Sequence, residues 1–497
     1  MKRILFVITF LTCALVSWAY NIEVKNADGV TIYYNFINDG KELEVTLKMF
    51  KDYSGTVVIP EIVTYNNVTR KVTSIGKGAF EYCEELTSVT IPNTVTSIGE
   101  NAFSECSGLT SITFPNGLKS IGKTAFKRCT GLTSVSISDN VTELGNGAFL
   151  GCKNLTDLKI SKNLTTIDGA FSGCSSLTSF TVPDGVTSIS GFNQCTSMTS
   201  ITIPNSVTSI DEYTFSSCTS LTSITIPEGV TYIAKFLFEY CKSLASVTMP
   251  EGVTSIGRNA FYDCRALTSI TIPSSVTSIG KEAFFACKSL TSLTIPDNVT
   301  TIGVNAFQNC SAMTTFTFGK SVTSIGSSSF SFCDTLQTII SKIEDPFPLY
   351  YVFTDKVYSN ATLYVPVGTI DKYRATEGWN QFKLIKEGDG GDPSVKPTKC
   401  ATPTIAYKDG KLVFDCETEG VEFVYSFKSA LANEGVGNHI SLPSKYTVTV
   451  YAKKAGYENS DTATQEIQLQ GATTDTNGDG IVDTQDVLEI YKYIQEH

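Results

Sequence analysis

A repeat of 23 residues fills more than half of this 497-residue chain and limits what it can fold into. The copies run from about Val57 to Ile339, and the stretch from Leu221 to Ser243 reads "LTSITIPEGVTYIAKFLFEYCKS". One cysteine marks each of twelve copies at intervals of 23 residues, except for intervals of 22 and 21 before the fifth and sixth. These cysteines are Cys83, Cys106, Cys129, Cys152, Cys174, Cys195, Cys218, Cys241, Cys264, Cys287, Cys310 and Cys333. A fixed period of this length is typical of a solenoid.

Each copy predicts two short strands and a tight corner. From Leu221 to Pro227, apolar and hydroxyl side chains alternate with the period of a strand, and the proline ends that strand. A second apolar pair, such as Val207 and Ile210, predicts a second extended segment. The pattern Gly-x-x-Ala-Phe-x-x-Cys then predicts a glycine corner and a short helical turn that points Phe and Cys inward. One copy buries only about six side chains, so copies must stack to fold.

The periodic cysteines predict a column of buried, reduced thiols. Equivalent atoms of neighbouring coils would lie about 4.8 Å apart, which permits a disulfide. Parallel Cα–Cβ vectors disfavour the dihedral angle that a disulfide needs, so a disulfide ladder is the less favoured alternative. Zinc is excluded at these positions, because the chain has no Cys-x-x-Cys pair and its two histidines, His439 and His497, lie outside the repeats.

The sequence resembles a known repeat family. The copy from Leu267 to Ser289, "LTSITIPSSVTSIGKEAFFACKS", looks like the bacterial BspA-type, or Treponema-type, leucine-rich repeat. The stretch from Val57 to Phe80 is similar to that family's first coil, and Ala361 to Glu387 resembles its closing segment. The resemblance implies a leucine-rich repeat solenoid of about 12 coils, with a parallel β-sheet, short second strands and helical turns. It also implies export and binding to proteins or surfaces, without catalysis.

Composition narrows the function classes in the same direction. The chain holds 38 basic and 49 acidic residues, a net charge of −11, whereas a nucleic-acid binder needs a basic face. The repeats contain no histidine, and no acid pair, nucleophile–base pair or phosphate loop stands out. We therefore expect a protein that is not an enzyme and does not bind nucleic acid.

The N-terminus predicts export. Lys2 and Arg3 precede an apolar run from Ile4 to Val16, and the small residues that follow indicate cleavage after Ala19. The run is too short to span a bilayer comfortably, and the residues before Cys13 make a poor lipoprotein signal. No second apolar run of spanning length follows, so we expect a secreted or cell-surface protein without a transmembrane segment after cleavage.

Composition shifts along the chain predict seven segments. A cap is expected at each end of the solenoid, because an open end exposes unpaired backbone groups. The expected segments are a signal peptide (1–19), an N-terminal β cap (20–56), the leucine-rich repeats (57–340), a C-terminal cap (341–388), a linker (389–398), a small β-sandwich (399–470), and a calcium loop with a helix (471–497).

The predicted β-sandwich contains five short strand-like runs, and it resembles small modules that follow such repeats in this family. Asp409-Gly410 between the first two runs predicts a hairpin turn. The registry of that hairpin places Cys416 opposite Pro403, so a bond between Cys400 and Cys416 needs a slip or a bulge. The sequence leaves that disulfide open.

The outward positions of the first strands form the candidate binding face. They carry two columns of Ser and Thr, interrupted by a charged pair in one copy, and the candidate residues are Asp157, Lys159, Ser200, Thr202, Ser223 and Thr225. The expected partner is a host or matrix protein or a surface glycan. A merely solvated surface is an alternative, and the hydroxyl grid is also similar to the lattice of solenoid ice-binding proteins.

Two copies depart from the period. The copy with "IDGAFSGC" (167–174) lacks one residue after its second strand, and the copy with "ISGFNQC" (189–195) lacks two. The losses fall on the side away from the first strand. We therefore expect the main sheet to keep its register and the opposite side to tighten.

The C-terminal stretch "DTNGDGIVDTQD" has the spacing of a calcium loop. Its expected ligands are Asp475, Asn477, Asp479, the carbonyl of Ile481, Asp483 and Asp486. Aspartate at the last position resembles the dockerin form of the loop, which suggests a cohesin-like scaffold as a further candidate partner, although a true dockerin has two such copies. The alternatives are a structural subunit that docks through this loop, and an acidic tail that binds no metal.

Overall fold

The computed structural model describes residues 20–47, 53–388, 401–408, 411–417, 421–429, 445–453 and 460–468. The chain divides into two compact units, Met1–Gly390 and Gly391–His497, and each is described by itself. The predicted signal peptide (1–19), the predicted linker (389–398) and the predicted calcium loop with its helix (471–497) lie outside the described residues.

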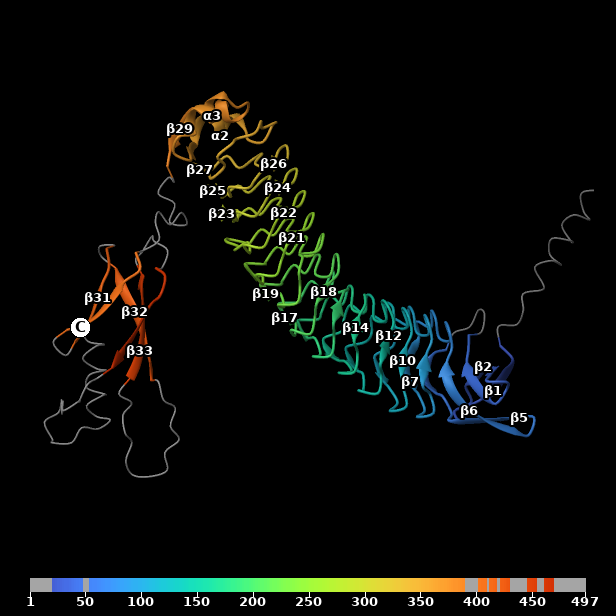
Figure 1. Ribbon diagram of the computed structural model, residues 1–497. Helices are drawn as coiled ribbons and strands as arrows, with labels where there is room; N and C mark the ends of the chain where they lie inside the picture. The colour runs from blue at the N-terminus through green and yellow to red at the C-terminus, as the bar shows by residue number, and fades with distance from the viewer. Residues whose placement is uncertain are drawn as a thin grey trace, which may run out of the picture. The chain divides into compact units, whose positions relative to one another are not determined.

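The first unit is a stack of short coils, a β-solenoid of about 14 turns with little helix (Figure 1). The predicted solenoid is therefore confirmed, and the caps account for the turns beyond the twelve that cysteine marks.

Most coils contribute one short strand to the first sheet, and the strands that pair do so in parallel and in register. Ser200 pairs with Ser179, and Ser223 pairs with Ser246. These strands are β4 (Gly55–Val58), β7 (Leu86–Thr90), β9 (Ser111–Thr113), β11 (Ser134–Ser136), β13 (Asp157–Lys159), β15 (Ser179–Thr181), β17 (Ser200–Thr202), β19 (Ser223–Thr225), β20 (Ser246–Thr248), β23 (Ser292–Thr294), β25 (Thr315–Phe318) and β27 (Thr338–Ser341). The first coil thus begins at Gly55, two residues before the predicted start.

The second strands form the second sheet on another side of the coils. Most are two residues long, and Ile279 pairs with Ile256 and Ile302 on either side. They are β6 (Val68–Ile75), β8 (Ser97–Ile98), β10 (Ser120–Ile121), β12 (Glu143–Leu144), β14 (Thr166–Ile167), β16 (Ser188–Ile189), β18 (Ser209–Ile210), β21 (Ser255–Ile256), β22 (Ser278–Ile279), β24 (Thr301–Ile302) and β26 (Ser324–Ile325).

The corner that follows the second strand is not the helical turn that we expected. Its backbone amides alternate between two kinds of partner. Ala102 N–H donates to Gly99 O in its own coil at 3.3 Å, whereas Phe103 N–H donates to Ala125 O in the next coil at 2.7 Å. Asn101 makes this possible by adopting a positive φ of 55°. Half of the corner amides therefore extend the coil-to-coil ladder, which a helix would not allow.

The corner glycine is needed for close approach rather than for its backbone angle. Gly280 does not have a positive φ, but a Cβ there would lie 2.6 Å from the backbone nitrogen of Arg258 in the preceding coil. A Cβ at Gly303 would lie 2.4 Å from the nitrogen of Lys281. Only glycine lets successive coils stack at this distance.

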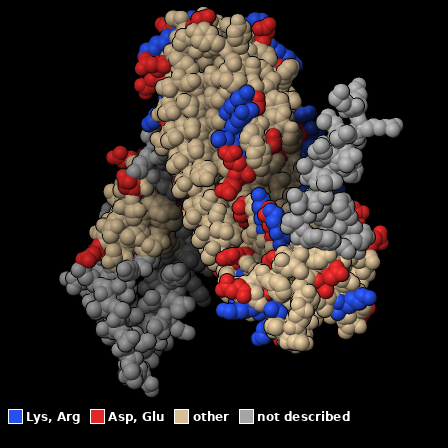
Figure 2. All heavy atoms as spheres, turned by 90° about the vertical axis from the view of Figure 1, so that its right-hand side faces the viewer, with Lys and Arg blue, Asp and Glu red and all other residues tan. Residues whose placement is uncertain are grey.

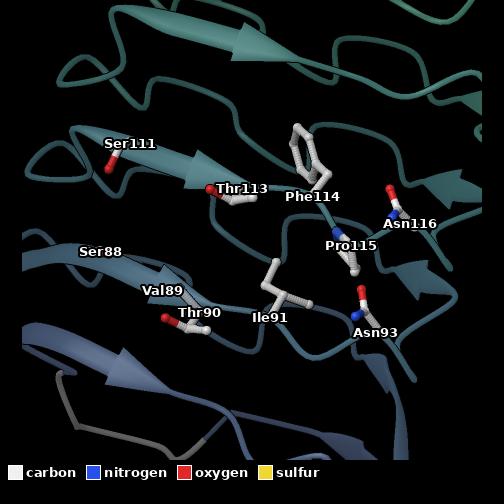
Figure 3. A pocket seen from close by; sticks show the side chains of 10 residues that line it. All are labelled: Ser88, Val89, Thr90, Ile91, Asn93, Ser111, Thr113, Phe114, Pro115 and Asn116. Atoms are coloured by element: carbon white, nitrogen blue, oxygen red, sulfur yellow. The ribbon is translucent and has the colours of Figure 1, made fainter.

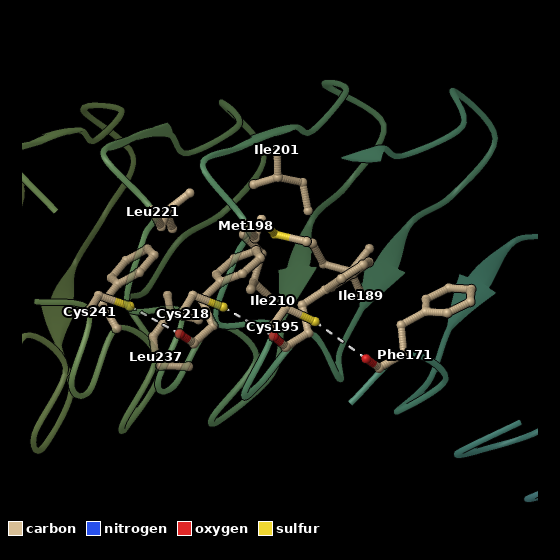
Figure 4. Packing of buried hydrophobic residues seen from close by; sticks show 14 of the residues in the cluster. Phe171, Ile189, Cys195, Met198, Ile201, Ile210, Cys218, Leu221, Leu237 and Cys241 are labelled. Carbon is tan, nitrogen blue, oxygen red and sulfur yellow. Dashed lines mark hydrogen bonds between the residues drawn. The ribbon is translucent and has the colours of Figure 1, made fainter. Parts of the chain in front are cut away.

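The core consists of columns of identical side chains, one from each coil. Phe103 stacks on Phe80 and Phe126 with ring centroids 4.9 and 5.0 Å apart. All twelve repeat cysteines are buried and unbonded, as predicted. Each from Cys106 onward donates its thiol to the phenylalanine carbonyl of the preceding coil, as Cys218 does to Phe192 at 3.1 Å (Figure 4).

An N-terminal cap closes the first end of the solenoid. Strands β1 (Ile22–Lys25), β2 (Thr31–Ile37) and β3 (Glu42–Val45) run antiparallel to one another, and β3 pairs in parallel with β6. Strand β5 (Ile62–Tyr65) forms a hairpin with β6. The ring of Tyr53 lies 4.7 Å from that of Phe80 and so covers the first ring of the core.

A C-terminal cap closes the other end. It contains α2 (Asp355–Asn360), β28 (Thr362–Val365), α3 (Ile370–Ala375), the short helix η2 (Trp379–Gln381) and β29 (Leu384–Glu387). Strands β28 and β29 extend the first sheet in parallel. The buried Trp379 ring packs edge-on against Phe318 at 5.8 Å, and its indole nitrogen donates to Phe347 O.

The second unit contains two small antiparallel sheets. Strands β30 (Thr404–Lys408) and β31 (Lys411–Asp415) form the predicted hairpin, and β32 (Glu422–Ser429), β33 (Lys445–Lys453) and β34 (Ala463–Gln468) form a three-stranded sheet. The Phe414 ring lies 5.3 Å from that of Tyr425. Cys416 is unbonded and donates to Ala401 O at 3.0 Å, whereas Cys400 lies outside the described residues.

Candidate binding face of the solenoid

The candidate binding face is the outward side of the first sheet, and its side chains follow from strand alternation. In β17 and β19 the central isoleucines are buried, while Ser200, Thr202, Ser223 and Thr225 are exposed. Parallel pairing places equivalent side chains of neighbouring coils beside each other, so the hydroxyls form two columns along the sheet. The structure therefore brings the predicted hydroxyl residues onto one surface.

The solenoid holds two classes of surface hydroxyl, and they do different things. Thr222 precedes the strand, and its hydroxyl donates to Thr199 O of the preceding coil at 3.3 Å. Thr254 does the same to Thr231 O at 3.0 Å beside the second strand. By contrast, within the described residues no protein hydrogen bond involves the hydroxyls of Ser223 or Thr225. The first class holds coils together, and the second class is available to a ligand.

Asp157 and Lys159 interrupt this face. They lie in β13, opposite Ser134 and Ser136 of β11, and both are exposed. No ion pair in the described part of the chain includes either residue. The two charges are therefore free to meet charges on a partner.

A hollow of about 430 Å³ lies near the N-terminal end of the face. Figure 3 shows Thr90, Ser111 and Thr113 on β7 and β9, with Phe114 and Pro115 just beyond. The Asn93 and Asn116 amides also line it. Its lining thus combines hydroxyls, amides and an aromatic ring, which are the groups that a polar macromolecule can contact.

The face ends before the C-terminal cap. Thr317 of β25 and Ile340 of β27 occupy strand positions but are buried, with exposed fractions of 1% and 2%. The last exposed pair of hydroxyls in the series is Ser292 and Thr294. The cap therefore limits the available surface to the coils before β25.

Charge is unevenly spread over the solenoid. On the side that Figure 2 shows, basic and acidic side chains gather in patches, and wide areas between them carry neither sign. The thiols add no reactive group to this surface, because burial raises the pKa of Cys152, Cys195 and Cys241 to about 12. A thiol with such a pKa is protonated and inert at neutral pH.

Sequence analysis missed two features of the solenoid surface. One is the hollow beside Phe114. The other is a pocket on the second-strand side, where Tyr232 and Ala234 replace the serine and glycine of most copies. These departures from the repeat were the available signal. The expected calcium ligands from Asp475 to Asp486 lie outside the described residues.

Comparisons with known proteins agree with this architecture. The model of the BspA type leucine rich repeat region matches residues 73–191, 190–312 and 254–345, which together cover more than half of the chain. No curated protein matches this chain. Within the described residues, no helix has the length and apolar character that a membrane crossing requires.

Three solved structures are similar to this chain. A leucine-rich repeat protein from Bacteroides ovatus is 28% identical, with a TM-score of 0.51, over 67% of this chain and 98% of that one. The pneumococcal vaccine antigen PcpA is 19% identical, with a TM-score of 0.52, over 75% of this chain and 100% of that one. A leucine rich cell surface protein from Faecalibacterium prausnitzii is 25% identical, with a TM-score of 0.44, over 72% of this chain and 98% of that one. With the repeat model matched from residue 73 to residue 345 on a solenoid of the expected kind, the chain belongs to the BspA-type leucine-rich repeat family.

Proposed function

We propose that this protein is an exported, adhesin-like binding protein whose solenoid contacts a host or matrix protein, or a surface glycan, through the outward face of its first sheet. The observation that carries the proposal is the division of labour among the hydroxyls. Thr222 and its equivalents hold the coils together, whereas Ser223 and Thr225 have no protein partner within the described residues and remain exposed. Solenoids of this family are typically non-catalytic, which agrees with a binding role.

The face suits a large partner rather than a small molecule. Exposed hydroxyl pairs recur from Ser111 and Thr113 to Ser292 and Thr294, and Asp157 and Lys159 add one site of each charge. Extended surfaces of stacked repeats are the binding surfaces that solenoid proteins commonly use. An ice-binding role is less well supported, because the first strands pair in five separate groups rather than in one unbroken lattice.

A paired charge insertion tests this face. The variant Ser223→Asp with Thr225→Asp places two carboxylates on the first sheet. The control Thr301→Asp with Ser324→Asp places two at exposed positions of the second sheet. Binding of both variants and the wild type to an array of matrix proteins and glycans would be compared. We expect the first variant alone to lose binding, and equal binding by both variants would contradict the proposal.

A second candidate function is a non-catalytic subunit of an extracellular assembly that docks through the C-terminal loop. The observation that favours it is the donor set of four aspartates, one asparagine and a carbonyl, with Gly480 at the turn position, which fits calcium. The loop would hold the ion through Asp475, Asn477, Asp479, the carbonyl of Ile481, Asp483 and Asp486. The single copy makes a cohesin-like scaffold one candidate partner among others.

Calcium titration of the full chain, followed by calorimetry, tests this loop. We expect a heat of binding that Asp475→Ala removes, with a dissociation constant of roughly 10⁻⁵–10⁻³ M. Absence of heat in the wild type would show that the tail holds no calcium. A pull-down with a chain truncated after Gln470 then separates docking through the loop from binding through the solenoid.

A further inference from the structure

A pocket of about 550 Å³ opens on the second-strand side of the solenoid, between coils that elsewhere are joined by hydrogen bonds. Its lining includes Ser190, Asp211, Glu212, Tyr232, Lys235 and Ser255. These residues come from four successive coils, and none lies on the outward face of the first sheet. The pocket is therefore separate from the candidate binding face.

An interruption of the coil-to-coil ladder accounts for this pocket. In the neighbouring coils, Thr254 N–H donates to Thr231 O at 2.8 Å and Gly257 N–H donates to Ile233 O at 2.8 Å. The equivalent amides, those of Thr231 and Ala234, make no backbone hydrogen bond to the preceding coil within the described residues. Two bonds that recur in most other coils are missing here, as they also are at Thr165 and Asp168, so the coils separate on this side.

Ala234 explains the separation. It stands at the corner position where regular coils carry glycine, and a Cβ at that position in Gly280 would lie 2.6 Å from backbone of the preceding coil. A methyl group cannot occupy that space, so the coil that contains Ala234 stands away from the preceding coil. The same copy replaces the usual outward serine of the second strand with Tyr232, a residue that is 42% exposed.

A shortened corner two coils before Ala234 opens the pocket further. There Ser190 and Gly191 lead directly to Phe192, whereas the next coil has Glu212 and Tyr213 in the same loop. The corner amide of Phe192 donates to Thr214 O, which aligns the two coils and leaves nothing opposite Glu212 and Tyr213 in the shortened copy. The Glu212 carboxylate, which is paired with Lys235 at 3.0 Å, therefore borders a step in the solenoid surface.

We propose that this pocket binds a neutral oligosaccharide. A pyranose ring offers a face of C–H groups that can lie against the electron-rich face of Tyr232. Its hydroxyls can donate to the carboxylates of Asp211 and Glu212 as charge-assisted hydrogen bonds and accept from Lys235. The volume lies within the range of small-ligand pockets and fits one or two sugar units, not the surface of a folded protein.

The charges of the pocket favour a neutral sugar over an acidic one. Asp211 and Glu212 contribute two negative charges, and the single ammonium group of Lys235 is already paired with Glu212. An acidic sugar would face repulsion from the remaining carboxylate. Phosphate and nucleic-acid ligands are disfavoured for the same reason.

Saturation-transfer NMR and calorimetry on the full chain test the proposal. The probes are cellohexaose, xylohexaose, mannohexaose and chitohexaose, with sialyllactose as the acidic comparison. We expect at least one neutral hexasaccharide to bind, and sialyllactose not to bind. If no neutral probe binds with a dissociation constant below about 1 mM, or if sialyllactose alone binds, the proposal is wrong.

Two variants and a matched control locate the site. Tyr232→Ser restores the residue that other copies carry, as in Ser209 and Ser255, so we expect the fold to persist and affinity to fall at least about tenfold. Glu212→Gln removes one carboxylate acceptor and leaves the Tyr232 ring unchanged, so it should weaken binding. Tyr82→Ser removes a ring that is 63% exposed in another coil and should leave affinity unchanged. Wild-type affinity in both Tyr232→Ser and Glu212→Gln would overturn the proposal, whatever happens on the first-sheet face.

Discussion

The coils that keep the 23-residue period and the coils that depart from it pack the same column of phenylalanine rings, but at different spacings. From Phe80 to Phe149 the centroids of successive rings in the column lie 4.9–5.1 Å apart, whereas from Phe149 to Phe215 they lie 5.8–6.1 Å apart. The hydrogen bonds from the cysteine Sγ atoms to phenylalanine carbonyl oxygens lengthen as well, from 3.0 Å at Cys129 to 3.4 Å at Cys195. Loss of corner residues therefore loosens the core there, although we had expected that side to tighten.

The corner glycine explains where the ladder survives a departure and where it fails. Ser190 and Asp211 both replace glycine, yet their amides still donate to the preceding coil at 2.7 and 3.1 Å. Each follows a coil that lacks corner residues, so space is left for a side chain. Ala234 follows a complete coil and has no such space, and there the ladder opens. The coils with a corner glycine thus keep the hydrogen bonds that stabilise the stack, whereas the coil with Ala234 loses them and opens a pocket on the surface.

Alkaline pH should produce the largest effect, because buried thiols are common to both kinds of coil. Burial raises the pKa of Cys152, Cys195 and Cys241 to about 12, above an unfolded value of about 8.5. The stability that these thiols contribute is complete below pH 8.5 and is lost as pH rises toward 12. Within that window, each of these thiols lowers the free energy of unfolding by about 1.4 kcal/mol for every unit of pH increase.

Thermal unfolding between pH 7 and 11 measures this loss. The midpoint should be nearly constant up to about pH 8.5 and then fall steeply. A midpoint that stays constant to pH 11 would contradict the buried thiol column in both regions.

Removal of one ring should show that the regular coils are the better packed. Phe261 has neighbours at 5.4 and 5.0 Å, and Phe261→Ala should cost about 3–5 kcal/mol. Phe192 has column neighbours at 5.8 and 6.1 Å, with Phe180 tilted against it at 5.2 Å. The wider spacing of the column predicts a smaller cost for Phe192→Ala. Denaturant midpoints of the two variants decide, and a larger loss at Phe192 would break the comparison.

A methyl exchange at the corner should act in opposite directions in the two regions. Gly280→Ala forces a Cβ against backbone of the preceding coil and should cost about 1–3 kcal/mol. Ala234→Gly removes the methyl group that separates two coils, so stability should stay the same or rise. Calorimetric unfolding of both variants measures this, and equal destabilisation would refute the role given to the glycine column.

The smallest effect is expected on the outward face. Ser223 is exposed, and no protein hydrogen bond involves its hydroxyl in the described residues, so Ser223→Ala should cost under about 0.5 kcal/mol. Thr222→Ala removes the bond to Thr199 O and should cost more. If chemical denaturation finds the reverse order, the two classes of hydroxyl are wrongly assigned.

Periodic side chains could be predicted from sequence, and close contacts between backbones could not. The alternation around Ile224 and the spacing of Cys218 and Cys241 fix which residues face inward, because these depend only on position within one coil. The reason for the glycine at Gly280 depends on its distance to the preceding coil, which no single copy encodes. The pocket at Tyr232 was missed for the same cause, since it arises from two coils that fail to meet.

Hydrogen–deuterium exchange on the unliganded full chain tests the central comparison most directly. Thr300 and Gly303 donate to Thr277 O and Ile279 O at 2.9 Å, and we predict slow exchange of their amides. The amides of Thr231 and Ala234 occupy the same positions without those bonds, and we predict fast exchange. Equal protection of the two pairs would contradict the account, because it would mean that the ladder continues through Ala234 and that no pocket opens there.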